Sequence, residues 1–308
     1  MKDITVRGPV VKGSAVKGTG VKGTGVETLR RRMLPLLVLI GVAGLMQACA
    51  VTRVGDNLPY GILNNDDVTL VAEGLPTYLL MVDGLIVNWP DSVDMLRSGA
   101  SLYSAYAGLF VEEPERQARL TEKALDYASR AACARRAVLC DARGMNVPKL
   151  EDTLAGLRAR DVPVLYTLGT TWAGYIQAHS DDWSAVADLA RVRALLERVV
   201  ELDEAYESGQ AHMYLAVLDS LLPGALGGQP EAAKAHFEQA IALSDGRNLL
   251  AKVLYAERYA RMASDQALHD DLLERVLAAD PAEHGLTLQN TFARQEAERL
   301  LAESADYF

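Results

Sequence analysis

Aromatic residues are scarce in this sequence, at 6% of its 308 residues, and only 23% of the residues are charged. Strands draw on aromatic and β-branched side chains, so the scarcity argues against a β-sandwich. Half of the residues are hydrophobic, mainly alanine and leucine, which favour helices. A chain with this hydrophobic share buries a sizeable core, which excludes wholesale disorder. We therefore expect an all-α protein.

Motifs of catalysis and of nucleotide or metal binding are missing. The sequence has no HExxH, GxSxG, GxxxxGK[ST] or helix-opening GxGxxG pattern. None of its five histidines lies three or four residues from another, the spacing that two metal ligands on one helix need. His212 and His236 could still meet across a helix pair, where a hydrogen-bonded or cavity-lining role is favoured over metal binding. We predict a protein that is not an enzyme and has no cofactor and no metal.

The charge is divided unevenly along the chain. The net charge is −10, yet the first 48 residues hold eight basic and two acidic residues. The remaining residues therefore hold 23 basic and 39 acidic side chains, a net charge of −16. Phosphate binding needs the opposite sign, which argues against nucleic acid as a partner.

The N-terminus has the pattern of a targeting segment. A basic cluster at 30–32 precedes an uncharged apolar run at 33–46, which is short for a membrane span and typical of a signal peptide. It ends in Ala48 and Cys49, which resemble the lipobox of bacterial lipoproteins. In that family the leader is removed, and the cysteine is acylated and becomes the new N-terminus. The alternative is a free cysteine just after an ordinary signal peptide or a short anchor.

These features divide the chain into three parts. Residues 1–48, with a low-complexity Val-Lys-Gly repeat at 10–26, form a signal peptide that is removed. Residues 49–66 are rich in turn residues, and we interpret them as a tether from the lipid to the body. Residues 67–308 form a helical-repeat domain.

Cys133 and Cys140 remain after the leader is removed. On one continuous helix a spacing of seven residues separates them by about 10 Å, whereas a disulfide tolerates about 7 Å between Cα atoms. The pair could join only if the helix breaks between them, although an oxidising compartment would allow the bond. We favour two buried, unpaired cysteines.

The first half of the body predicts three helices. Asp66 or Asp67 can cap a helix that runs to about residue 88, and Pro90 starts a second helix through about residue 110. Pro114 starts a third, through at least residue 132. Almost no segment alternates with a period of two, so we predict no sheet.

The second half repeats one helical pattern. Offsets 0, 4 and 7 share a helix face and offset 12 follows the helix end, as in the second helix of a tetratricopeptide repeat. The copies are Val192, Leu196, Val199 and Glu204; Ala233, Phe237, Ala240 and Asp245; and His269, Leu273, Val276 and Pro281. Each follows a partner helix, at 163–179, 208–222 and 248–262. We predict a tetratricopeptide-like solenoid, a superhelix of helix pairs, with capping helices at 286–303.

Four side chains form a candidate cavity. Trp172 and Tyr175 lie three apart on one helix face, and solenoids bind on their concave faces. His212 interrupts an apolar helix face, and Tyr214 points about 200° away from it. We hypothesise that the four line a ligand or partner cavity between adjacent helix pairs, with His212 ranked above Tyr214. In the competing interpretation, Trp172 fills the core and His212 bonds a backbone carbonyl.

The body resembles the TatT component (T component) of tripartite ATP-independent periplasmic (TRAP) transporters. The resemblance spans about residues 66–280 and rests mainly on a Gly-x-x-His phrase and a Leu-Pro-x-x-x-Gly-Gly phrase. The matching segments are 99–106, 164–174, 199–206, 209–212, 222–228 and 236–238. The resemblance implies an all-helical, lipid-anchored scaffold of cryptic tetratricopeptide type, without catalytic residues to transfer.

The same resemblance implies partners and a location. Its members pair with the periplasmic solute-binding subunit of the transporter, carry a cavity for a small apolar or organic-acid ligand, and in some cases form homo-trimers. Ala50 follows Cys49 where an aspartate would favour retention in the inner membrane, so the expected location is periplasmic and anchored in the outer membrane. The alternative function is a lipid-anchored tetratricopeptide assembly factor for cell-envelope or secretion machinery.

Overall fold

The computed structural model describes residues 61–221 and 228–308, which belong to one compact unit. The predicted signal peptide, Cys49 and most of the tether therefore lie outside the described residues, as does the segment 222–227.

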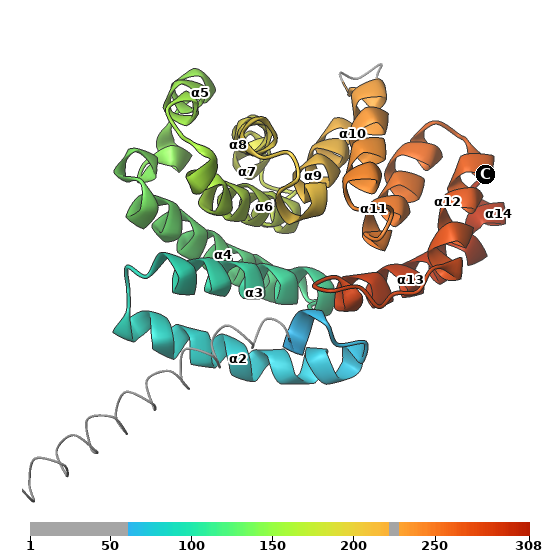
Figure 1. Ribbon diagram of the computed structural model, residues 1–308, viewed down its shortest axis with the longest axis horizontal. Helices are drawn as coiled ribbons and strands as arrows, with labels where there is room; N and C mark the ends of the chain where they lie inside the picture. The colour runs from blue at the N-terminus through green and yellow to red at the C-terminus, as the bar shows by residue number, and fades with distance from the viewer. Residues whose placement is uncertain (1–60, 222–227) are drawn as a thin grey trace, which may run out of the picture. The chain divides into compact units, whose positions relative to one another are not determined.

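All regular structure within the described ranges is helical (Figure 1). The elements up to residue 178 are α2 (Val68–Asn88), α3 (Val93–Phe110), α4 (Pro114–Arg135), the 3₁₀ turns η1 (Ala137–Leu139) and η2 (Ala142–Gly144), α5 (Val147–Ala155), η3 (Ala159–Asp161) and α6 (Val162–Ala178). The elements that follow are α7 (Trp183–Val186), α8 (Leu189–Leu202), η4 (Tyr206–Gly209), α9 (Gln210–Asp219), α10 (Pro230–Leu243), α11 (Leu249–Leu254), the π-helical turn η6 (Tyr255–Ala260), α12 (Gln266–Ala278), α13 (Thr287–Ala302) and α14 (Ser304–Tyr307). The all-α prediction is confirmed.

The helix starts follow local capping chemistry. The Asp67 carboxylate accepts a hydrogen bond from the backbone of Leu70 and caps α2, as predicted. Pro114 opens α4 at a position where its missing N–H costs nothing. The prediction that Pro90 starts α3 is wrong: Ser92 is the N-cap, and its hydroxyl accepts from the backbone of Met95.

Successive helices pack side by side and form a solenoid. Contacts join α3 to α4, α4 to α6, α6 to α8, α8 to α9 and α9 to α10. The last long helix does more than cap the end, because α13 also contacts α2 (Figure 1). The backbone N–H of Gly285 donates to Asn64 Oδ1 at 2.8 Å. The two ends of the described chain are therefore joined.

The repeated helix faces are the buried ones. The positions at offsets 0, 4 and 7 are all inaccessible to solvent, in α8, in α10 and in α12. Their small and branched side chains let neighbouring helices approach closely, and Phe237 in the middle copy is among the largest fully buried side chains. Burial on this face is the main stabilising contribution of each helix.

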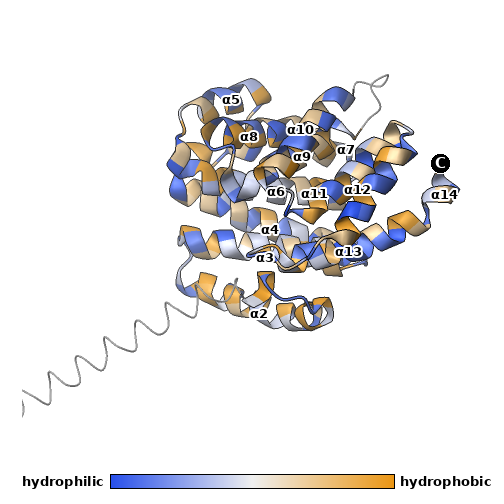
Figure 2. Cartoon of the chain, turned by 45° about the vertical axis from the view of Figure 1, so that its right-hand side comes forward, coloured by the Kyte–Doolittle hydropathy of each residue, from blue (hydrophilic) through white to orange (hydrophobic). Residues whose placement is uncertain are grey.

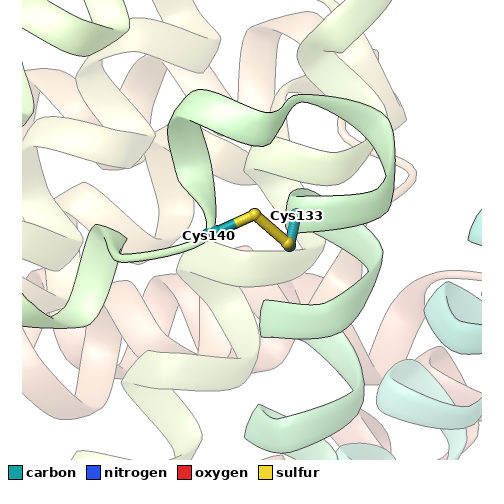
Figure 3. Close-up of a disulfide and its surroundings, with 2 residues drawn as sticks. All are labelled: Cys133 and Cys140. Atoms are coloured by element: carbon teal, nitrogen blue, oxygen red, sulfur yellow. A yellow bond between two sulfur atoms is a disulfide. The ribbon is translucent and has the colours of Figure 1, made fainter.

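The prediction of unpaired cysteines is wrong. Cys133 and Cys140 form a disulfide with Cα atoms 4.2 Å apart (Figure 3). Helix α4 ends at Arg135, and Arg136 adopts an extended backbone that turns the chain back through η1. Nor is the pair buried, because Cys133 is half-buried and Cys140 is exposed. The helix break, which the spacing alone could not reveal, makes the bond possible.

We expect Cys133→Ser with Cys140→Ser to lower the free energy of unfolding by about 2–3 kcal/mol, because the bond restricts a short loop in the unfolded chain. Urea denaturation of the two forms measures this difference. A reductant should destabilise the wild type by the same amount and leave the double variant unchanged. Equal stability of the oxidised wild type and the double variant would contradict the role assigned to the bond.

Candidate functional site

Three tyrosines converge where α6 meets the start of α9, and we call them the tyrosine cluster: Tyr166, Tyr206 and Tyr214. The Tyr166 ring centroid lies 5.3 Å from that of Tyr206 and 6.5 Å from that of Tyr214, both edge-on. All three side chains are half-buried. Burial raises the pKa of Tyr166 and of Tyr214, so both remain neutral phenols. The cluster combines apolar ring surface with hydroxyl groups that donate or accept.

Arg97 of α3 reaches the cluster from the neighbouring helix. Its Nε donates to the Pro163 carbonyl at 3.1 Å and to Thr167 Oγ1 at 3.2 Å. Its Nη2 donates to the Tyr206 hydroxyl at 3.2 Å. All three acceptors are neutral, while burial raises the pKa of Tyr206 and the Glu207 carboxylate, which lies near its hydroxyl, helps to raise it. A half-buried guanidinium usually pairs with a carboxylate, so this position suits an anionic group from outside the chain.

A strained turn places Tyr206 beside Tyr166. Glu207, Ser208 and Gly209 have φ values of 48°, 56° and 76°. A left-handed backbone costs a non-glycine residue roughly 1–2 kcal/mol. At Gly209 a Cβ would also lie 2.6 Å from the Leu243 side chain, which explains why the Gly-x-x-His phrase begins with glycine.

His212 of α9 and His236 of α10 meet across the helix pair, with 2.7 Å between their Nδ1 atoms. His212 Nε2 lies 3.2 Å from Glu204 Oε1. A carboxylate only accepts, so we assign the His212 proton to Nε2, and His236 donates from its Nδ1. His236 Nε2, which carries no proton in this arrangement, lies 3.9 Å from Asp219 Oδ2 and forms no hydrogen bond with it. The two histidines, which the sequence left free to meet across the helix pair, do meet.

The histidine pair prefers the neutral state. Loss of solvent lowers the pKa of His212 below its usual value, against the opposing effect of Glu204. Loss of solvent also lowers the pKa of His236, and the neighbouring His212 lowers it further. The buried Asp219 carboxylate is already engaged by Arg193 Nη2, which donates to Oδ1 at 2.6 Å. The pair is thus a hydrogen-bonded link between α9 and α10.

Trp172 and Tyr175 belong to a third location. Trp172 is fully buried, and its indole N–H donates to Asp188 Oδ2 at 3.2 Å. Arg143 lies over both rings, at 5.9 Å from Trp172 and 5.5 Å from Tyr175. The ring of Tyr175 also stacks on His179, 4.1 Å away. Through Arg143, the η2 turn that follows the disulfide therefore packs on α6.

The structure therefore separates the four predicted cavity residues. Tyr214 lies in the tyrosine cluster, His212 in the histidine pair, and Trp172 with Tyr175 under Arg143. The sequence argument did not single out Arg97, because its partners lie on elements 66 to 109 residues away. Tyr166 and Tyr206 stood in matching phrases, and only the strained turn brings them together.

A comparison with known protein families shows which family the chain belongs to. Residues 64–308 match the family described as TRAP transporter T-component (TAtT). The chain belongs to this family. An uncharacterized protein of Treponema pallidum (strain Nichols) is a relative, 26% identical over 238 residues, 70% of this chain and 72% of the relative. The family is that of a transporter component, periplasmic or membrane-associated, and the three locations described above all lie within the matched residues.

Trp172→Ala should lower the free energy of unfolding by about 3–5 kcal/mol, because it empties a fully buried site and leaves Asp188 without its indole donor. Trp183 is the matched control, since its side chain is 85% exposed. Trp183→Ala should change stability by no more than about 0.5 kcal/mol. Thermal or urea unfolding measures both, and equal effects would contradict the structural role of Trp172.

The histidine pair should make stability depend on pH. Both folded-state pKa values are lowered, so below about pH 6.5 the unfolded chain binds more protons and acid reduces the free energy of unfolding. His212→Asn with His236→Asn keeps an amide near each Nδ1 but cannot titrate. Urea unfolding at pH values of about 7.5 and 5.5 should show a smaller loss in this variant. Identical losses in variant and wild type would show that the pair does not titrate as described.

Proposed function

We propose that this chain is a lipid-anchored periplasmic scaffold of a TRAP transporter that binds the solute-binding subunit and a small organic acid. The family match supports the transport context. The disulfide supports an oxidising compartment such as the periplasm. The leader and Cys49 support the anchor, and Ala50 supports the outer membrane as its site.

The observation that carries the ligand proposal is Arg97 beside the tyrosine cluster. Its contacts use Nε and Nη2, and a guanidinium has further donors on Nη1. A ligand carboxylate would give the guanidinium a charged acceptor in addition to the neutral ones that it contacts. The apolar part of the same ligand would lie against the tyrosine rings, whose edges and hydroxyls also offer hydrogen bonds.

The three locations then have different roles. The tyrosine cluster, which includes Tyr214, forms the ligand surface together with Arg97. The histidine pair fixes α9 against α10 and so holds Tyr214 in place. Trp172 and Tyr175 stabilise α6, the helix that carries Tyr166. The four residues first grouped by sequence would thus serve one site, Tyr214 directly and the other three through the packing of its walls.

Arg97→Gln should weaken carboxylate binding about tenfold or more, because hydrogen bonds between charged groups contribute about 1.5–3 kcal/mol. The probes are short aliphatic and aromatic carboxylates, titrated calorimetrically against the purified mature protein. Arg119→Gln, an exposed position on α4, is the matched control and should bind like the wild type. The ligand proposal fails if no carboxylate binds, or if both variants bind equally well.

A further inference from the structure

Helix α2 lies along one edge of the part of the chain that the structure describes (Figure 2), and large apolar side chains are exposed on its outer side. We call this side the α2 apolar face, and it consists of Leu70, Leu80, Met81 and Val87, with Trp89 directly after the helix end. Leu80 is 71% exposed and Val87 is 79% exposed. Monomeric proteins rarely expose a group of large apolar side chains together. An exposed face of this kind indicates contact with another apolar surface.

The charge pattern of α2 fits an apolar partner. Residues 68–88 contain no lysine or arginine, and their only charged residues are Glu73 and Asp83. Asp83 is engaged by the protein, accepting from Tyr103 at 2.8 Å, Tyr127 at 2.7 Å and Lys123 at 2.5 Å. Glu73 is thus the one carboxylate on the exposed side.

The helix stays on the protein body. By length and composition, α2 could cross a membrane. However, its opposite face is buried, with Val71, Leu75 and Leu79 shielded from solvent. Leaving the body would expose that face and remove Asp83 from its three hydrogen-bond donors. A position parallel to a surface keeps both sets of contacts.

We propose that the α2 apolar face lies on the lipid bilayer, an inference that rests on the acylation of Cys49 proposed above. Gly61 follows Cys49 by twelve positions, and an extended chain spans at most about 3.3–3.6 Å per residue. The start of the described chain therefore lies within about 40 Å of the acylated cysteine. Trp89 at the helix end has the amphipathic ring that interfaces favour. The anchor and the face together give two membrane contacts in place of one.

The test places an environment-sensitive thiol dye at Leu80→Cys in the mature, acylated protein. The native cysteines do not react, since Cys49 is acylated and Cys133 is bonded to Cys140. Trp183→Cys on α7 is the matched control, because Trp183 is 85% exposed and lies on another helix. Both proteins are bound to phosphatidylethanolamine–phosphatidylglycerol vesicles whose acyl chains carry bromine. We expect quenching of the dye at position 80 to exceed that at position 183 several-fold.

The outcomes separate the two proposals. Protein that floats with the vesicles but shows equal quenching at both positions overturns the bilayer contact and leaves the lipid anchor intact. Protein that does not float overturns both. Light scattering of the soluble Cys49→Ser form gives a further check: an oligomer that Leu80→Lys dissociates would assign the face to a second copy and overturn the proposal. If the soluble Cys49→Ser protein is a monomer both with and without Leu80→Lys, the result supports the bilayer contact.

Discussion

Close packing between successive helices is the constraint on which the rest of this structure depends. No helix buries its apolar face alone, so each needs its neighbour, as in other repeat proteins. Small side chains make the approach close enough: Ala233 and Ala240 of α10 are fully buried around Phe237. Gly169 serves the same purpose in α6, where a Cβ would lie 3.1 Å from Leu196. The contact between α13 and α2 then joins the two ends of the array.

The candidate site is a consequence of this packing. Arg97, Tyr166 and Tyr214 come from three different helices, and α3, α6 and α9 bring them together. The strained turn before α9 adds Tyr206, and the missing Cβ of Gly209 in that turn leaves room for the Leu243 side chain. Backbone strain of this kind often accompanies functional sites, which agrees with the role we propose for the cluster.

Local chemistry made much of the fold predictable from sequence. The start of α2 at its Asp67 cap, the start of α4 at Pro114 and the three repeated buried faces follow from capping and helical periodicity. Other features are not encoded by periodicity. The disulfide needed the local helix break at Arg136, and Trp172 and His212 are separated because each bonds to a residue on a different part of the chain.

The central claim is that this chain acts with the solute-binding subunit of a TRAP transporter. The most direct measurement is the affinity between the mature protein and that subunit from the same genome, with and without the transported solute, by calorimetry. The account predicts a specific complex with a dissociation constant of roughly micromolar or tighter, whose affinity changes when the solute is present. Two folded proteins that do not associate under either condition would contradict it.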